Sequence, residues 1–319
     1  MHGLLEVKDL RVSFSTSQGE VPALDGVSFS VTPGRLTGLV GESGSGKTVS
    51  MLSIMRLLPE NARVVAGSIM LEGLDLLRLS EAEMRAIRGG RIAMIFQEPM
   101  TSLNPVFTIG NQIGEAIRLH QHTSRRETRA RTVEALRMVG IADPGRRASD
   151  YPHQLSGGMR QRVMIAMALA CNPQVLIADE PTTALDVTIQ AQILDLIRDL
   201  QSRLGLAVVL VTHDLGIVAQ YADDVTILYA ARVMERTSAT ELFRNPLCPY
   251  TKALFAALPG IEHGRRRLQA IPGLVPSPLN PPAGCRFHPR CQIAIEDCSR
   301  IAPPLEEKIP GHYVSCIRV

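Results

Sequence analysis

The octet GESGSGKT, residues 41–48, carries the most readily interpreted chemistry in the sequence. It fits the pattern G-x-x-x-x-G-K-[ST], follows the apolar run LTGLV and precedes a helical pattern, which is the context that a phosphate-binding loop requires. Glycines let backbone N–H groups surround a β-phosphate, Lys47 neutralises the β- and γ-phosphate oxygens, and the Thr48 hydroxyl ligates Mg²⁺. The expected phosphate contacts are Gly41, Ser43, Gly44, Gly46, Lys47 and Thr48. By itself, the loop indicates only a nucleoside triphosphatase.

A pair of carboxyl groups, Asp179 and Glu180, follows the apolar run VLIA at residues 175–178. A short apolar run of this kind predicts a buried strand, so both groups would lie at its C-terminal end. There Asp179 would hold the Mg²⁺ shell, and Glu180 would act as the general base that polarises the attacking water. An isolated Asp-Glu pair after a strand is often a helix cap, and the phosphate loop is what favours the catalytic interpretation.

The stretch QLSGGMRQRVMIAMALA, residues 154–170, starts with small residues and continues as an apolar helical pattern. Ser156, Gly157 and Gly158 would leave backbone N–H groups accessible at a helix N-terminus, which suits a phosphate. The alternative is a helix start at which glycines permit close packing. The chain would then carry two phosphate cradles, far apart in the sequence.

Strand-like and helix-like segments alternate along the chain, which predicts an α/β fold. The segments LLEVKDLRVSF and LDGVSFSV are rich in strand-forming residues and precede LTGLV. Further strand candidates are RIAMIFQ and AVVLVTH. Residues from about 100 to 170 switch to helical periodicity, as in GNQIGEAIRLH and RETRARTVEALRMVG, and form a helical insertion. Proline-rich text then separates a nucleotide-binding domain, residues 1–245, from a small irregular domain, residues 246–319.

The composition limits the classes of partner. The chain has 319 residues, of which 45% are apolar and 20% charged, as in a folded soluble protein. Its formal net charge is only +3 and its basic residues are scattered, so we expect no nucleic-acid partner. No apolar stretch approaches the ~20 residues of a spanning helix, and the N-terminus lacks a signal-peptide pattern. We therefore expect a cytoplasmic chain that would need another subunit to cross a membrane.

The segment LSGGMRQR resembles the signature sequence of ABC-type ATPases. In that family two nucleotide domains face each other head to tail, and each ATP lies between one chain's phosphate loop and the other's signature. The resemblance implies that Ser156, Gly157 and Gly158 contact the γ-phosphate of the partner's nucleotide. It also implies a P-loop α/β domain with an antiparallel β subdomain and a helical insertion, which binds ATP and Mg²⁺ and hydrolyses ATP.

Further residues match motifs of the same family over about residues 4–245. Gln97, in IFQEP, matches the glutamine that contacts Mg²⁺ and water, and His213 matches the switch histidine that holds the γ-phosphate. The sequence ALD at 184–186 matches the loop that signals between paired sites, which adds Asp186 to the expected nucleotide contacts. Phe14 is a candidate to stack on adenine, although it could equally be a core strand residue.

Three stretches resemble the ATPase subunits of bacterial dipeptide and oligopeptide importers. They are FQEPMTSLNPVFTIGNQIGEAI, DEPTTALDVTIQAQIL and the tail beginning NPLCPYTKALFAALP. This resemblance implies a peripheral protein at the cytoplasmic face of the inner membrane. Its partners would be two transmembrane permease subunits, whose coupling helices reach residues 97–114, and a second homologous ATPase. The two ATPases would form a heterodimer, with a homodimer as the alternative. A separate extracytoplasmic binding protein would deliver the peptide.

Other assignments share the nucleotide motifs. Related importers carry nickel or other small solutes, and substrate contacts would lie on other chains. A soluble ABC ATPase acting on DNA or ribosomes usually has a second cassette, long coiled coils or basic arms, and an exporter usually has a fused membrane domain. None of these features is present in the sequence.

The tail contains four clustered cysteines, Cys285, Cys291, Cys298 and Cys316. The cytosol disfavours stable disulfides, so this cluster suggests a metal, and four thiolates suit either Zn²⁺ or a [4Fe–4S] cluster. The resemblance to peptide importers favours the [4Fe–4S] cluster, with Zn²⁺ and unligated thiols as alternatives. His288 and His312 are possible substitute ligands that fit surface or packing positions better, and Cys171 and Cys248 suit ordinary packing.

Overall fold

Strand β3 (Leu36–Val40) leads directly into the phosphate loop, and helix α1 (Lys47–Met55) follows the loop. Every residue of β3 is buried, as its mainly apolar sequence predicts for a parallel strand. The helix ends at Met55, although the helical pattern of KTVSMLSIMRLL predicts a helix that continues to Leu58. The reason is local, because Arg56 adopts a left-handed conformation with φ 49° and its N–H bonds back to the helix.

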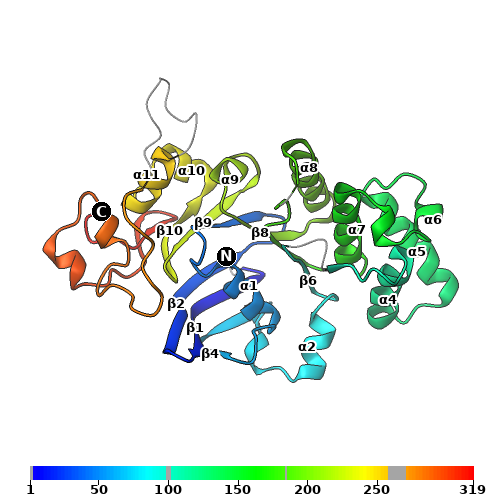
Figure 1. Ribbon diagram of the computed structural model, residues 1–319, viewed down its shortest axis with the longest axis horizontal. Coiled ribbons are helices and arrows are strands. Elements are labelled where there is room, and N and C mark those ends of the chain that lie inside the picture. The colour runs from blue at the N-terminus through cyan, green and yellow to red at the C-terminus, as the bar shows by residue number, and fades with distance from the viewer. Residues whose placement is uncertain (1–2, 98–101, 184, 258–270) are drawn as a thin grey trace. The chain divides into compact units, whose positions relative to one another are not determined.

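The computed structural model describes residues 3–97, 102–183, 185–257 and 271–319. The chain divides into two units. Figure 1 colours the ribbon by residue number, from blue at the N-terminus to red at the C-terminus. The first comprises residues 1–32, 37–77 and 212–319, and the second comprises residues 33–36 and 78–211. Within the described part of the chain, no helix is long and apolar enough to span a bilayer.

The first unit contains two sets of strands. An antiparallel sheet has the order β2-β1-β4-β5, in which β1 pairs with both β2 and β4. The other set has the order β11-β12-β10-β9-β3, with β3 and β9 parallel and the remaining pairs antiparallel. The strands are β1 (Leu5–Thr16), β2 (Gly19–Val31), β4 (Ala62–Leu71), β5 (Leu74–Asp75), β9 (Asp224–Tyr229), β10 (Arg232–Ser238), β11 (Glu306–Ile309) and β12 (His312–Val314). The helices after α1 are α9 (Leu215–Tyr221), α10 (Ala239–Arg244) and α11 (Pro249–Ala256).

The second unit joins three parallel strands to a group of helices. Strand β7 (Val175–Asp179) lies between β6 (Ile92–Ile95) and β8 (Ala207–Thr212). Helices α4, α5 and α7 contact one another, and Figure 1 shows them grouped in green. The helices are α2 (Glu81–Ile87), α4 (Ile109–Gln121), α5 (Arg125–Met138), α6 (Pro144–Arg147), α7 (Gly157–Leu169) and α8 (Val187–Leu204). The predicted helical segments between β6 and β7 are thus α4 and α5.

The C-terminal tail is only partly irregular. Residues 271–305 contain two short 3-10 helices, at His288–Arg290 and Glu296–Ser299, whereas β11 and β12 add an antiparallel edge to β10. Phe287 and Val314 of the tail share one buried cluster with Val225 and Tyr229 of β9. The tail therefore packs on the strands of the first unit through a common apolar core.

Candidate nucleotide site

Lys47 sets the geometry of the phosphate loop. Its side chain is largely buried, and its Nζ donates to the carbonyl oxygens of Gly41 at 2.7 Å and Glu42 at 3.0 Å. The ammonium group therefore lies across the loop, held by the loop's own backbone. Ser43, Gly44 and Thr48 are exposed around it. The predicted phosphate contacts thus lie together on one accessible loop.

Two positions of the loop require glycine, because neighbouring strands approach their backbone closely. A Cβ on Gly41 would lie 2.2 Å from the Leu228 carbonyl oxygen, on β9. Gly46 has φ 103°, and a Cβ there would lie 2.6 Å from Leu24 Cδ2, on β2. Any side chain at either position would displace the loop from the strands beneath it.

The loop fits a bound triphosphate with Mg²⁺. Ser45 Oγ is buried and has no hydrogen-bond partner within the described residues, so it offers an unsatisfied polar group in the loop. Helix α1 begins at Lys47, and the backbone N–H groups of its first turn favour the binding of an anion. The exposed Thr48 hydroxyl has the chemistry of a Mg²⁺ ligand. Ser45 was not among the predicted site residues, although its place between the glycines of the motif could have indicated it.

In the second unit, the structure brings Gln97 and Glu180 together. Glu180 Oε2 accepts hydrogen bonds from Gln97 Nε2 at 3.0 Å and from Thr183 Oγ1 at 3.1 Å. Asp179, which ends β7, is buried. Thr183 was missed in the sequence, where only its spacing of three residues after Glu180 could have suggested a contact.

Glu180 also has a strained backbone. Its φ is 46°, in the left-handed region that non-glycine residues rarely adopt, and its N–H donates to the Val211 carbonyl oxygen at 3.0 Å. Such strain typically costs about 1–3 kcal/mol and concentrates at functional sites. The bond to Val211, on β8, holds the turn after β7 in this conformation.

The second candidate cradle is an accessible helix N-terminus. Ser156 caps α7, with its Oγ accepting from the Met159 N–H at 3.3 Å, and both Ser156 and Gly157 are exposed. Gly158 also has a packing role, because a Cβ there would lie 2.9 Å from Ile189 Cγ2 on α8. The anion-binding and packing interpretations are thus both compatible with this helix start.

Of the remaining predicted nucleotide residues, Asp186 belongs to the second unit, and Phe14 and His213 belong to the first. Asp186 is exposed and caps α8, accepting from the Ile189 N–H at 3.0 Å, whereas Ala184 lies outside the described residues. Phe14 is half-buried on β1, opposite Val21 and Ala62 of the adjacent strands. His213 is exposed, directly after β8.

Two of the four tail cysteines have thiols with raised pKa values. Burial raises the pKa of the Cys285 and Cys291 thiols, and the neighbouring Cys298 and Cys316 raise both pKa values further. Cys285 also donates its N–H to the Cys298 carbonyl oxygen at 2.9 Å. Nevertheless, among the residues that the structure describes, no three or more His, Cys, Asp or Glu side chains are arranged to hold a metal ion.

The two other cysteines and the two tail histidines are in packing positions. Cys248 is fully buried, and Cys171 Sγ donates to the Ala116 carbonyl oxygen at 3.4 Å. His312 is fully buried, and His288 lies with Nδ1 at 2.9 Å from the Cys285 carbonyl oxygen.

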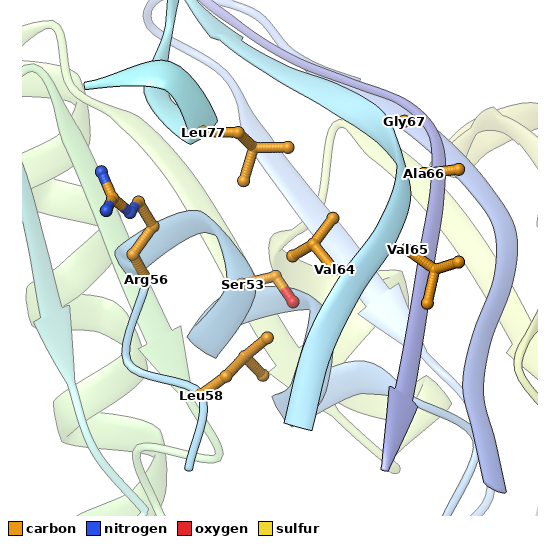
Figure 2. A pocket seen from close by; sticks show the side chains of 8 residues that line it. All are labelled: Ser53, Arg56, Leu58, Val64, Val65, Ala66, Gly67 and Leu77. Atoms are coloured by element: carbon orange, nitrogen blue, oxygen red, sulfur yellow. The ribbon is translucent and has the colours of Figure 1, made fainter. Parts of the chain in front are cut away.

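A hollow of about 420 Å³ lies between α1 and β4 in the first unit. Figure 2 shows Val64 of β4 pointing toward the side of the hollow formed by Ser53 and Arg56. Arg56 Nη1 donates to the Leu76 carbonyl oxygen at 3.4 Å. None of the predicted nucleotide residues lines this hollow.

Two sequence families match parts of the chain. The family described as ABC transporter matches residues 24–183, and the one described as oligopeptide/dipeptide transporter, C-terminal region, matches residues 234–298. The chain is 54% identical over 317 residues to a probable peptide ABC transporter ATP-binding protein of Sinorhizobium fredii, covering 99% of this chain and 95% of that protein. It is 49% identical over 317 residues to an oligopeptide transport ATP-binding protein of Bacillus subtilis, with coverages of 99% and 97%.

Solved structures share the fold. An ATP-binding cassette solved as a dimer, in a post-hydrolysis state with ADP and Pi, has a TM-score of 0.66 at 29% identity, covering 74% of this chain and 98% of that chain. The matched family, the near full-length relatives and the phosphate loop agree with the resemblance of the signature segment. The chain belongs to the ABC transporter family of ATPases.

Proposed function

We propose that this chain is the ATP-hydrolysing subunit of a peptide importer, with MgATP bound at residues 41–48. The contact between Gln97 and Glu180 at 3.0 Å carries the catalytic part of the proposal. It joins the residue expected to sense Mg²⁺ and water to the residue expected to activate that water. Bound Mg²⁺, held by Thr48, Gln97 and Asp179, would neutralise charge on the phosphate oxygens.

The hydrolysis step follows from the roles of these side chains. Lys47 orients and neutralises the β- and γ-phosphate oxygens, and His213 holds the γ-phosphate. Glu180 accepts a proton as the water oxygen bonds to the γ-phosphorus, and the bond from that phosphorus to the bridging oxygen breaks to release ADP. Gln97 and Thr183 fix the Glu180 carboxylate, which limits its rotation before the water arrives.

Replacing Glu180 with Gln tests the base assignment. The amide cannot accept the proton, so ATP turnover should fall by about 10²–10⁴-fold while MgATP affinity stays at the wild-type value. Steady-state phosphate release and calorimetric titration with MgATP measure the two quantities. Glu296→Gln is the control, because Glu296 forms an exposed ion pair with Arg300 in the tail. Normal turnover in Glu180→Gln would refute the assignment.

The transport assignment rests on the C-terminal match and on the relatives' names. Residues 234–298 match a region described for oligopeptide/dipeptide transporters. Relatives whose sequences are 54% and 49% identical to this chain are named as peptide or oligopeptide transporter ATP-binding proteins. The chain would work beneath two permease subunits at the cytoplasmic face of the membrane, paired with a homologous ATPase. A separate solute-binding protein would supply the peptide.

Reconstitution tests this assignment. The permease subunits and both ATPases, placed in proteoliposomes with the solute-binding protein, should take up labelled dipeptide or oligopeptide only when MgATP is supplied. Lys47→Ala should stop uptake. ATP-dependent uptake of nickel without uptake of peptide would assign the chain to another class of importer.

We also propose that Cys285, Cys291, Cys298 and Cys316 hold a [4Fe–4S] cluster, with Zn²⁺ as the alternative. Four thiols within one short tail, one of which (Cys285) donates its N–H to the carbonyl oxygen of another (Cys298) at 2.9 Å, support this proposal. The side chains would have to converge further on binding, because the described residues form no ready-made metal group.

Metal content decides between these alternatives. Anaerobically purified protein should contain about four irons per chain, with broad absorbance near about 400 nm. Both should be lost in Cys291→Ser and retained in Cys171→Ser. Stoichiometric zinc would establish the alternative ligand, and the absence of both metals would overturn the proposal.

A further inference from the structure

Glu42, the second residue of the phosphate loop, is held at three of its polar groups. Its carbonyl oxygen accepts from Lys47 Nζ at 3.0 Å, and its N–H donates to Tyr250 Oη at 3.4 Å. Its carboxylate receives both terminal nitrogens of Arg290, Nη1 at 2.7 Å and Nη2 at 3.2 Å. One residue thus links the loop's lysine to α11 and to the C-terminal tail.

The Arg290 side chain is buried and makes hydrogen bonds to several groups besides Glu42. Only 5% of its side chain is exposed, its Nε donates to the Pro272 carbonyl oxygen at 3.0 Å, and its Nη1 also donates to Tyr229 Oη at 3.2 Å. Behind it, the Tyr229 ring lies 4.5 Å from the Tyr250 ring and 5.4 Å from the Phe287 ring, between centroids. A guanidinium with this many bonds has little freedom to move away from Glu42.

The charge of Glu42 explains why such a partner matters. A phosphate loop must receive a highly negative triphosphate, and a carboxylate within that loop opposes the approach of this charge. A buried bidentate arginine offsets the carboxylate charge and fixes its direction. Without Arg290, the carboxylate would be a partly buried, uncompensated negative charge beside the incoming phosphates.

We propose that Arg290 is a positioning residue for nucleotide binding, through which the C-terminal tail sets the affinity of the phosphate loop for MgATP. This inference rests on the proposed nucleotide role of residues 41–48. It adds that the tail acts on the nucleotide-binding loop through the ion pair between Arg290 and Glu42. Because linkage is reciprocal, MgATP binding stabilises the tail to the same extent that the tail favours MgATP.

Replacing Arg290 with Gln tests the proposal. The dissociation constant for MgATP should rise about tenfold, and KM should rise with it while kcat stays near the wild-type value. The double variant Glu42→Gln/Arg290→Gln removes both charges and should recover most of the lost affinity. Arg290→Lys keeps the charge without the bidentate geometry and should fall between wild type and Arg290→Gln. Calorimetry with MgATP and steady-state phosphate release supply these values.

Arg286→Gln provides the matched control. Arg286 is also a buried arginine of the tail, but its Nη2 donates to Asp25 Oδ2 at 2.8 Å rather than to the phosphate loop. Arg286→Gln should lower the unfolding temperature and leave the MgATP dissociation constant unchanged. An equal loss of affinity in both variants would overturn the proposal, since general weakening of the tail would then be sufficient.

Two further outcomes separate this inference from the proposed function. If Lys47→Ala abolishes MgATP binding while Arg290→Gln binds normally, the phosphate loop stands and the role of Arg290 is overturned. If Lys47→Ala still binds MgATP at wild-type affinity, the loop assignment fails, and the inference fails with it. A double variant no better than Arg290→Gln would also overturn the charge-compensation argument.

Discussion

Asp25 shows how a partly buried charge is stabilised by arginines from distant parts of the sequence. Its Oδ2 receives Arg286 Nη2 at 2.8 Å and Arg232 Nη2 at 2.7 Å, and its Oδ1 receives Arg11 Nη1 at 2.7 Å. Burial would raise the pKa of this carboxyl, but the hydrogen bonds from Arg286 and Arg232 outweigh burial and hold the pKa below 3.8. The folded state therefore favours the charged form of Asp25.

This pKa shift predicts a pH-dependent stability. A carboxyl group with a lowered folded pKa contributes stability that is fully present above the unfolded pKa, 3.8, and is lost as the pH falls through the folded value. Asp25→Asn should reduce the free energy of unfolding by about 2 kcal/mol at neutral pH, and by less at about pH 3. Urea unfolding across that range measures the difference. Asp199→Asn, in an exposed pair with Arg203, is the control and should change little at either pH. A pH-independent effect of Asp25→Asn would contradict the assignment.

At the scale of elements, a buried side-chain pair holds the tail's last strand to the sheet. Within the described part of the chain, β12 pairs with β10 at two positions, Glu235 with Val314 and Arg236 with Tyr313. Glu235 and His312 are both fully buried, with Glu235 Oε1 at 2.7 Å from His312 Nε2. Glu235 also accepts from the N–H groups of Leu247 and Cys248, at 2.7 and 3.2 Å. This side-chain junction adds to the strand pairing, next to which the Ser315 N–H donates to the Met234 carbonyl oxygen at 2.9 Å.

Removing the Glu235 carboxylate should therefore loosen β12. Glu235→Ala leaves His312 and two backbone N–H groups without their acceptor and should cost about 3–5 kcal/mol of unfolding free energy. Hydrogen exchange at the β12 amides should rise, and equilibrium unfolding gives the total loss. Lys308→Ala on the neighbouring β11, whose partner Glu306 is exposed, should have no comparable effect. Unchanged exchange at β12 would show that the hairpin is held by other contacts.

At the scale of the whole molecule, the exposed Ser156–Gly157 helix start predicts a partner. In ABC-type ATPases such a signature faces another chain's nucleotide, and one solved cassette with the same fold is a dimer. The Glu180→Gln variant should bind MgATP without hydrolysing it. In the presence of MgATP this variant should therefore associate with a second nucleotide-binding domain, and the two should dissociate when the nucleotide is removed. Light scattering after gel filtration measures the mass. Ser156→Arg should prevent association without altering MgATP affinity, and a dimer that persists in Ser156→Arg would contradict the role of the signature.

Much of the local structure follows directly from the sequence. The strand predicted at LTGLV is β3 with the same bounds, the strand predicted at VLIA is β7, which extends one residue further to Asp179, and the helix predicted near residues 110–120 is α4. A short run of mainly apolar residues predicts a strand that is buried on both faces. The helical pattern is equally local, because it depends on residues three and four positions apart. The phosphate loop was predictable for the same reason, because its conformation depends on glycines and a lysine within eight successive residues.

The contacts that tune this chemistry were decided only by tertiary structure. Gln97 and Glu180 lie 83 residues apart, Glu42 and Arg290 lie 248 apart, and Asp25 and Arg286 lie 261 apart. No local pattern marks Arg290 as the partner of a loop glutamate, because that pairing depends on the tail packing against β9 and α11. The sequence by itself determined the chemical groups and the elements that carry them. Tertiary packing determined which charges meet, because burial and long-range pairing arise only when distant segments share one core.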